Sequence, residues 1–589
     1  MDKRTIIALI VIGIIILFYD DYLRLLYPPP PETSEAPADT LTPPRQTITP
    51  STRPTPGIGR GDFEGETTLV KETGEGFVAP DSLPERFITV ETDRFRARFS
   101  SHGARLVSLT LKPNGRYLKK DIELLSRGEN SHLGFRFWTV DGPLETSGLN
   151  FRLVGGDDHS DRVISLSGNQ SRNVEFQARL GPELTLSVTY SFNGSGYSFI
   201  YTVRGEGTEN FWVRDYGEVF WSGGLAFTEA DTGQDGYYSK AYTFYSGNVL
   251  ENLKLNGKKA QTVGPSTGDT RWGAVRTKYF LMALIPETAL AVGAWMENQL
   301  DSSYVGNNPP NRLGVGLRIP VQGGSPVTPI TVFIGPLDVS ILSKVDPSLK
   351  RTMSWGWAII APFSKVILWG LKKLGDIIPN YGICIIIFSV LIKVIIWPLT
   401  RKSYQSMAAM QQLQPKIKAM REKFKNDQQR MQKELMKLYK EEKINPMGGC
   451  LPVLLQMPLL WALFIVFRST IEFRRAPFVF WIDDLSMPDI ILHLPFTIPI
   501  YGSYVALLPI LMGISTFLQS KSTMTDPNQK MMLYFMPIFM TLIFNQFPSG
   551  LTLYYTLFNI WTMLQQRITP PPRLATATEP EDGNKSQRR

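Results

Sequence analysis

Polar side chains inside long apolar segments are the residues of this sequence with the clearest chemical potential. Lys393 is the one basic residue deep within such a segment, and Ser389 lies one helical turn before it on the same face. A charge near the middle of a bilayer costs about 2.5–3.5 kcal/mol on insertion scales. We therefore expect Lys393 to face water, a lipid phosphate or an acidic group of a bound protein. The alternative is an anchoring role, in which its long stem carries the ammonium to the nearby inner surface.

Other apolar segments contribute uncharged hydrogen-bonding side chains. These residues are Gln456, Asn545, Gln546, Tyr554, Tyr555 and Asn559. The other apolar segments contain no Asp or Glu that could neutralise Lys393. Together with Ser389 and Lys393, the polar side chains predict a hydrated groove that is open to the cytoplasm.

The sequence shows no residue pattern that is typical of covalent catalysis or metal binding. His102, His132 and His159 have no partners at metal-ligand spacing. The sequence has no G-x-S-x-G motif and no phosphate-binding glycine loop that joins a strand to a helix. We therefore expect no enzyme activity, no metal, no cofactor and no small-molecule substrate.

The elements that position the polar residues are apolar runs of membrane-spanning length. The chain has 589 residues, of which 43% are hydrophobic and 20% charged, and most of the apolar runs lie after residue 350. A helical span needs roughly 17–25 apolar residues. We predict six spans, at 5–19, 377–399, 451–467, 498–518, 531–547 and 551–568. A soluble enzyme, a fibrous protein and a wholly disordered chain are excluded.

The first apolar run follows a basic start and belongs to an N-terminal segment at 1–27. Because no A-x-A pattern follows the run, we expect an uncleaved signal anchor, with a cleaved signal peptide as the alternative. The proline-rich stretch at 28–85 is a disordered tether by composition. Residues 86–345 contain short alternating runs separated by turn residues, which predict an antiparallel β-sandwich outside the cytoplasm.

The second half of the chain is helical by pattern. Aromatic and aliphatic residues at helical spacing predict an amphipathic helix at 348–375, lying on the outer leaflet. A core with five spans follows at 376–568, with a tail at 569–589. The fold class is thus an α-helical polytopic membrane protein with six transmembrane helices and an inserted all-β periplasmic sandwich domain.

A charged loop at 400–447 separates the second and third spans. Between Arg401 and Lys443 it has twelve basic and five acidic residues, which is +7 of the chain's net +9. The positive-inside rule places this loop, and with it both termini, in the cytoplasm. Heptad spacing predicts a helical hairpin, with a kink at Pro415. Its methionine-containing stripe either only holds the hairpin together or also offers an adaptable surface to apolar segments of other proteins. The candidate contacts with such a protein, a ribosome or anionic lipids are Met410, Lys416, Lys418 and Arg421.

Several ordered motifs resemble the family of membrane protein insertases that includes the Oxa-type proteins of mitochondria. The motifs are Trp397-Pro398-Leu399-Thr400, Gln414-Pro415-Lys416-Ile417, Asn445-Pro446-Met447-Gly448-Gly449-Cys450, Gln456-Met457-Pro458, Ala476-Pro477-Phe478, Trp481-Ile482-Asp483-Asp484-Leu485 and 547–555. The resemblance covers 350–568 densely, and the N-terminal half matches the layout of the Gram-negative form. It implies a location in a bacterial inner membrane, a hydrophilic groove and a periplasmic β-supersandwich similar to galactose mutarotases. It also implies nascent membrane proteins as clients and cooperation with the Sec translocon.

Two features depart from the family pattern. The family usually has Arg where this chain has Lys393, so the charge is kept while bidentate pairing is lost. The tail at 569–589 is only weakly basic, which weakens the case for ribosome binding through it. Two other classes stay open from the residues alone. A secondary transporter would show inverted repeats, and a membrane-bound carbohydrate enzyme would need acid–base residues at suitable spacing.

Overall fold

The structure is a computed structural model of the whole chain. It describes residues 84–125, 132–155, 162–207, 212–256, 259–300, 312–321, 329–425, 427–442, 451–523 and 530–569. The expected anchor at 1–27, nearly all of the tether at 28–85 and the tail beyond Thr569 lie outside the described residues. His159 and the motif at 445–450 lie outside them too.

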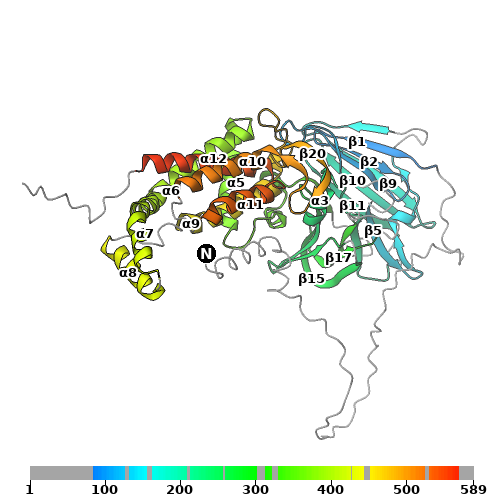
Figure 1. Cartoon of the computed structure of the whole chain (residues 1–589). Coiled ribbons are helices and arrows are strands. Elements are labelled where there is room, and N and C mark those ends of the chain that lie inside the picture. Colours follow the sequence, from blue (N-terminus) through cyan, green and yellow to red (C-terminus); the bar gives the residue numbers. More distant parts are fainter. Residues whose placement is uncertain are drawn as a thin grey trace, which may run out of the picture. The chain divides into compact units, whose positions relative to one another are not determined.

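The described residues between 86 and 345 form two β-sheets and two short α-helices, shown in blue to green in Figure 1. The smaller sheet has five strands in the order β4-β3-β2-β1-β8. These strands are β1 (Phe87–Glu91), β2 (Phe95–Ser100), β3 (Leu106–Leu111), β4 (Ile122–Glu123) and β8 (Arg162–Ser165). Burial alternates along β2, so one face of this sheet packs inward and the other faces outward.

The larger sheet has fourteen strands. Twelve follow the order β6-β5-β12-β18-β17-β15-β16-β19-β11-β10-β9-β7, and β13 and β14 join it through β15. Their bounds are β5 (His132–Thr139), β6 (Gly142–Glu145), β7 (Arg152–Leu153), β9 (Ser171–Arg179), β10 (Thr185–Asn193), β11 (Ser198–Glu206), β12 (Tyr216–Ser222), β13 (Lys240–Tyr245), β14 (Leu250–Lys254), β15 (Gln261–Arg276), β16 (Phe280–Pro286), β17 (Ala291–Asn298), β18 (Leu313–Pro320) and β19 (Ile330–Pro336). Its pairs are all antiparallel among the described strands.

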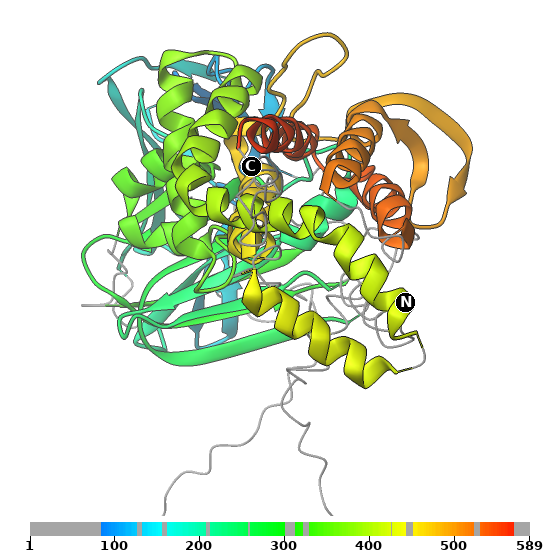
Figure 2. The same ribbon diagram turned by 60° about the vertical axis from the view of Figure 1, so that its left-hand side comes forward.

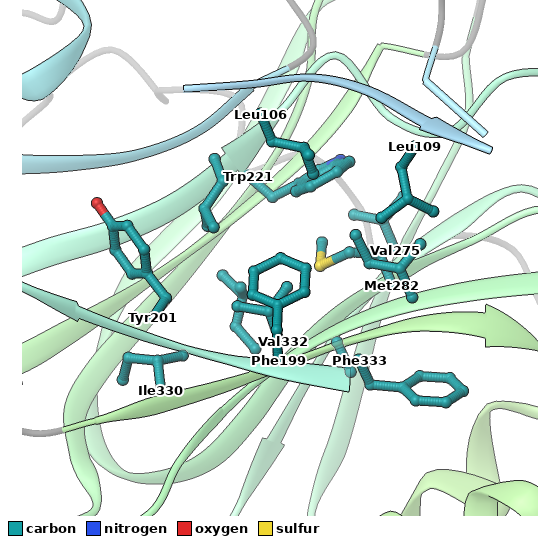
Figure 3. Close-up of a cluster of buried hydrophobic side chains, with 14 of the residues drawn as sticks. Leu106, Leu109, Phe199, Tyr201, Trp221, Val275, Met282, Ile330, Val332 and Phe333 are labelled. Atoms are coloured by element: carbon teal, nitrogen blue, oxygen red, sulfur yellow. The ribbon is translucent and has the colours of Figure 1, made fainter. Parts of the chain in front are cut away.

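One hydrophobic core joins the two sheets. In Figure 3, Leu106 and Leu109 of β3 point toward Trp221, Phe199 and other buried side chains of the larger sheet. This packing confirms the predicted sandwich and shows why a domain without cysteine can be stable. Its two short α-helices are α3 (Thr232–Tyr238) and α4 (Val339–Val345). The 3₁₀ turn η1 (Thr146–Gly148) lies within the domain, and a second 3₁₀ turn, η2 (Pro347–Thr352), follows it.

The helical region begins after the sandwich and has its own hydrophobic core. Its elements are α5 (Ala361–Ile377), α6 (Tyr381–Gln412), α7 (Gln414–Lys423), α8 (Gln428–Glu441), α9 (Leu451–Ser469), η4 (Ile471–Phe473), β20 (Ile490–Ile498), β21 (Gly502–Ala506), α10 (Leu507–Thr523), α11 (Lys530–Phe544) and α12 (Ser549–Ile568). Helix α6 contacts α5, α9, α10 and α12, and is therefore central to the bundle. Asn380 caps its first turn by accepting hydrogen bonds from the backbone N–H groups of Gly382 and Ile383.

The six predicted spans are not confirmed as a set. Within the described residues, Tyr381–Gln412 is the one helix with the length and composition to cross a membrane. Gln456–Ser469 and Leu533–Phe544 are shorter apolar helical stretches.

Two predicted boundaries and one predicted helix kink differ from the structure. The span predicted at 498–518 begins with a β-hairpin, and its helix starts only at Leu507. The helix predicted at 348–375 starts at Ala361, because a 3₁₀ turn and an extended stretch precede it. Pro415 does not kink a helix but stands in the first turn of α7, where its missing N–H costs nothing.

Candidate functional site

Lys393 lies between α6 and α12, in the interior of the bundle. Its side chain is only 4% exposed, and its ammonium donates a 2.8 Å hydrogen bond to Thr562 Oγ1. The ammonium also lies 4.5 Å from the centre of the Phe558 ring and 5.6 Å from that of Tyr404. Lys393 is therefore packed inside the bundle, and its expected contact with water, a lipid phosphate or an acidic group of a bound protein stays a prediction.

More polar side chains join α6 to α12 on either side of Lys393. The amide of Gln565, which is fully buried, donates to Thr400 Oγ1 at 3.0 Å. The indole N–H of Trp561 donates to Ser389 Oγ at 3.1 Å. We call these six residues the polar seam: Ser389, Lys393, Thr400, Trp561, Thr562 and Gln565. Ser389 and Lys393 were predicted, and the structure brings them together with partners that the sequence did not single out.

Sequence spacing could have pointed to the missed partners. Lys393 and Thr400 are seven residues apart on α6, and Thr562 and Gln565 are three apart on α12. Each pair therefore lies on one helix face. The sequence does not show that these two helix faces pack against each other.

The other predicted groove residues occupy separate places. Asn559 donates to Ser515 Oγ at 3.0 Å and to Thr516 Oγ1 at 2.9 Å, and so ties α12 to α10. Tyr554 and Tyr555 are in the first half of α12, and their buried hydroxyls have no hydrogen-bond partner among the described residues. Gln456 is half-buried on α9, outside the α6–α12 seam.

Asn545 and Gln546 serve the hairpin β20–β21, which corrects their assignment to the groove. The Asn545 amide donates to the carbonyl oxygens of Tyr501 and Tyr504, both at 2.8 Å, and its oxygen accepts from the N–H of Ala506 at 2.9 Å. Gln546 donates to the carbonyl oxygen of Ile500 at 2.8 Å. These amides satisfy backbone groups that the turn leaves unpaired.

The cytoplasmic candidates lie where α6 passes into α7. Lys418 is exposed, and Met410 and Arg421 are half-buried. Lys416 pairs with the buried carboxylate of Glu442 at 3.1 Å. Helices α7 and α8 contact each other as the predicted hairpin requires, although α6 continues well beyond residue 400 before α7 begins.

Buried ion pairs connect the β-sandwich with the helical region. The ammonium of Lys372 on α5 lies 3.0 Å from a carboxylate oxygen of Asp338 and 3.0 Å from one of Glu472. Arg474 is fully buried and lies 2.6 Å from Glu229. Burial raises the pKa of Glu472, and Lys372 opposes that effect. We call Lys372, Asp338 and Glu472 the charge triad.

Comparisons with known proteins cover nearly the whole chain. The family described as "60Kd inner membrane protein" matches residues 373–572, and the family "YidC periplasmic domain" matches 87–369. A "Membrane protein insertase YidC" of Chlorobium limicola is 33% identical over 580 residues, which are 96% of this chain and 94% of that protein. A protein with the same name from Chlorobium luteolum is 36% identical over 86% of each chain.

Among solved structures, the chain is similar to one described as an active YidC insertase with the first transmembrane domain resolved. The identity is 18% and the TM-score 0.35, covering 82% of this chain and 94% of that one. A galactose mutarotase related enzyme from Lactobacillus acidophilus is 11% identical with a TM-score of 0.27, covering 42% of this chain and 97% of that one. At these TM-scores, neither likeness carries an argument about fold or ligand.

Proposed function

The chain belongs to the YidC family of membrane protein insertases, and we propose that the polar seam between α6 and α12 is where it receives the polar flank of a client. The family consists of non-enzymatic inner membrane proteins with a periplasmic domain, and its clients are nascent membrane proteins.

One observation supports the seam more than any other. Lys393 is a nearly fully buried cation whose polar and aromatic contacts among the described residues are a neutral hydroxyl and two aromatic rings. Desolvation of a charge without an opposite charge is costly, and a residue that only packed α6 against α12 would not need to be charged. A carboxylate of the client would offset part of the desolvation cost of Lys393 by accepting a charge-assisted hydrogen bond from its ammonium.

The mechanism needs no covalent step. A client's polar flank costs several kcal/mol to move through hydrocarbon. The hydroxyl, amide and ammonium groups of the seam replace part of the water that the flank loses. The apolar segment of the client then moves into lipid, where burial of its side chains makes insertion favourable.

Photo-crosslinking tests this placement. A photoreactive amino acid at Phe558 faces Lys393, whereas one at Ile560 lies on the exposed side of the same helix. With a stalled client nascent chain, we expect several-fold more crosslinked client from position 558 than from 560. Equal yields from the two positions would place the client elsewhere.

Six spans with cytoplasmic termini are part of the proposal. Asp483 and Lys433 are exposed residues of two different loops and can therefore report which side of the membrane each loop faces. In a background with Cys384 and Cys450 replaced by Ser, Asp483→Cys should react with an impermeant maleimide added to intact spheroplasts. Lys433→Cys should react only after lysis. Labelling of Lys433→Cys in intact spheroplasts would contradict the proposed topology.

Additional partners follow from charge and family membership. The exposed Lys418 and neighbouring bases of α7 and α8 suit anionic lipid headgroups or ribosomal RNA. Lys416 suits them less, because Glu442 already neutralises it. The Sec translocon is a proposed partner for clients with several spans.

Helix α5 has an exposed apolar face, which includes Val366 and Trp369. This face supports the proposal that α5 lies on the outer leaflet.

A further inference from the structure

The hairpin β20–β21 exposes an unusual amount of apolar surface. Its exposed large apolar side chains are Ile491, Leu492, Phe496, Ile498 and Ile500, and Phe496 alone is 61% exposed. The stretch from Ile490 to Ser520 contains no Asp, Glu, Lys or Arg. A two-stranded ribbon of this kind, left in water, would be prone to pair with other chains, and charged residues that normally protect such edges are missing.

The hairpin is a built element and not an irregular loop. Ile500 has a φ of 71°, which a β-branched residue rarely adopts, and Gly502 follows it with a φ of 102°. The bonds from Asn545 and Gln546 hold this turn against the end of α11. Figure 2 shows the orange hairpin beside the helices of the same colour range.

The position of the hairpin follows from its direct connection to α10. Strand β21 ends at Ala506 and α10 begins at the next residue, so the hairpin ends where α10 begins. Exposed apolar residues continue down that helix at Leu511, Ile514 and Leu518. Leu507 to Leu518 rises only about 18 Å along a helix. The hydrocarbon of a bilayer is about 30 Å thick.

We propose that the hairpin is seated in the outer leaflet of the membrane, as an apolar extension of α10. Its open edges exclude a position deep in hydrocarbon, because unpaired backbone groups there would have no partner. It therefore lies at the headgroup boundary, with Phe496 and its apolar neighbours in the upper acyl region and the strand edges hydrated. The proposal rests on α10 crossing the membrane, but not on the polar seam.

Spin-label accessibility in the full chain tests the proposal. Single cysteines replace Phe496, Ile514 on α10, and Val140, which is 79% exposed at a turn of the sandwich. Each labelled protein, without Cys384 and Cys450, is reconstituted into phosphatidylethanolamine–phosphatidylglycerol vesicles. Collisions with oxygen report lipid, and collisions with a water-soluble nickel chelate report water.

We expect the label at 496 to resemble the one at 514, with severalfold less nickel collision than the label at 140. If 514 is shielded and 496 behaves like 140, the hairpin projects into water, free or against a soluble partner, and the proposal is wrong. If the label at 514 itself behaves like the one at 140, α10 does not cross the membrane, and the premise of the proposal is wrong. If nickel collisions at 496 decrease only when a client is added, the hairpin binds the client and does not lie in lipid, and the proposal is wrong.

Discussion

Replacing Lys393 with methionine is expected to slow insertion of a client with an acidic outer flank about tenfold or more. The same change should leave a neutral client nearly unaffected. Methionine keeps most of the side-chain volume between α6 and α12 and removes only the charge. A charge-assisted hydrogen bond contributes about 1.5–3 kcal/mol, which corresponds to that factor. The measurement is protease protection of two clients that differ only in flank charge, at equal insertase levels.

Two further variants separate charge from packing. Lys393→Arg should retain insertion of both clients, since the resemblance implies that a site of this kind accepts Arg. Thr562→Val removes the hydroxyl that accepts from Lys393 and leaves the cation in place, so it should spare the preference for an acidic flank. If Lys393→Met slows both clients equally, or neither, Lys393 has a structural role and electrostatic capture is wrong.

The sequence predicts the kind of each large element but not which helix faces meet. Lys393 stands out as a charge in an apolar run, and alternation along strands such as β2 predicts the sandwich. The partner of Lys393, Thr562, is 169 residues further along the chain, and no local pattern connects the two. The charge triad likewise draws its members from α5, η4 and the segment before α4.

The hairpin shows why an apolar run can be misread. A stretch without charges satisfies the composition of a span, and 498–518 has the right length. Pro495, Pro499 and Gly502 are the local signals against a helix there. Those signals do not show that the backbone will form a ribbon. Its turn depends on amides at Asn545 and Gln546, some forty residues later.

The charge triad predicts a large effect on stability when its only cation is removed. Asp338 and Glu472 have side chains that are 4% and 3% exposed, and Lys372 lies 3.0 Å from each. Lys372→Met leaves two buried carboxylates without a counter-charge. Loss of one partner from a buried pair typically costs about 3–5 kcal/mol, and we expect the lower end because Lys372 is partly exposed. The midpoint of thermal unfolding of the purified protein should fall by several degrees at pH 7.5.

The pH dependence of this loss distinguishes an electrostatic clamp from a packing defect. In the intact triad, the pKa of Glu472 is raised by burial and that of Asp338 is lowered, since Lys372 and the Ser340 hydroxyl outweigh its burial. Without Lys372, burial should raise the pKa of both carboxyl groups above their unfolded values. The folded variant then binds more protons than the unfolded chain, so its stability rises as the pH falls through the raised values. The deficit of Lys372→Met should therefore shrink between pH 7.5 and pH 5.

Lys373→Met is the matched control for the triad, because Lys373 is the exposed neighbour of Lys372 on α5. It removes the same charge from the same helix and should change the midpoint little, as surface charges usually do. A Lys372→Met midpoint equal to that of Lys373→Met at pH 7.5 would show that the triad does not hold α5 to the sandwich. A deficit that stays constant down to pH 5 would instead assign the loss to packing of the lysine stem. The expected result, a deficit that is specific to Lys372 and decreases on acidification, requires buried carboxylates that lose their charge.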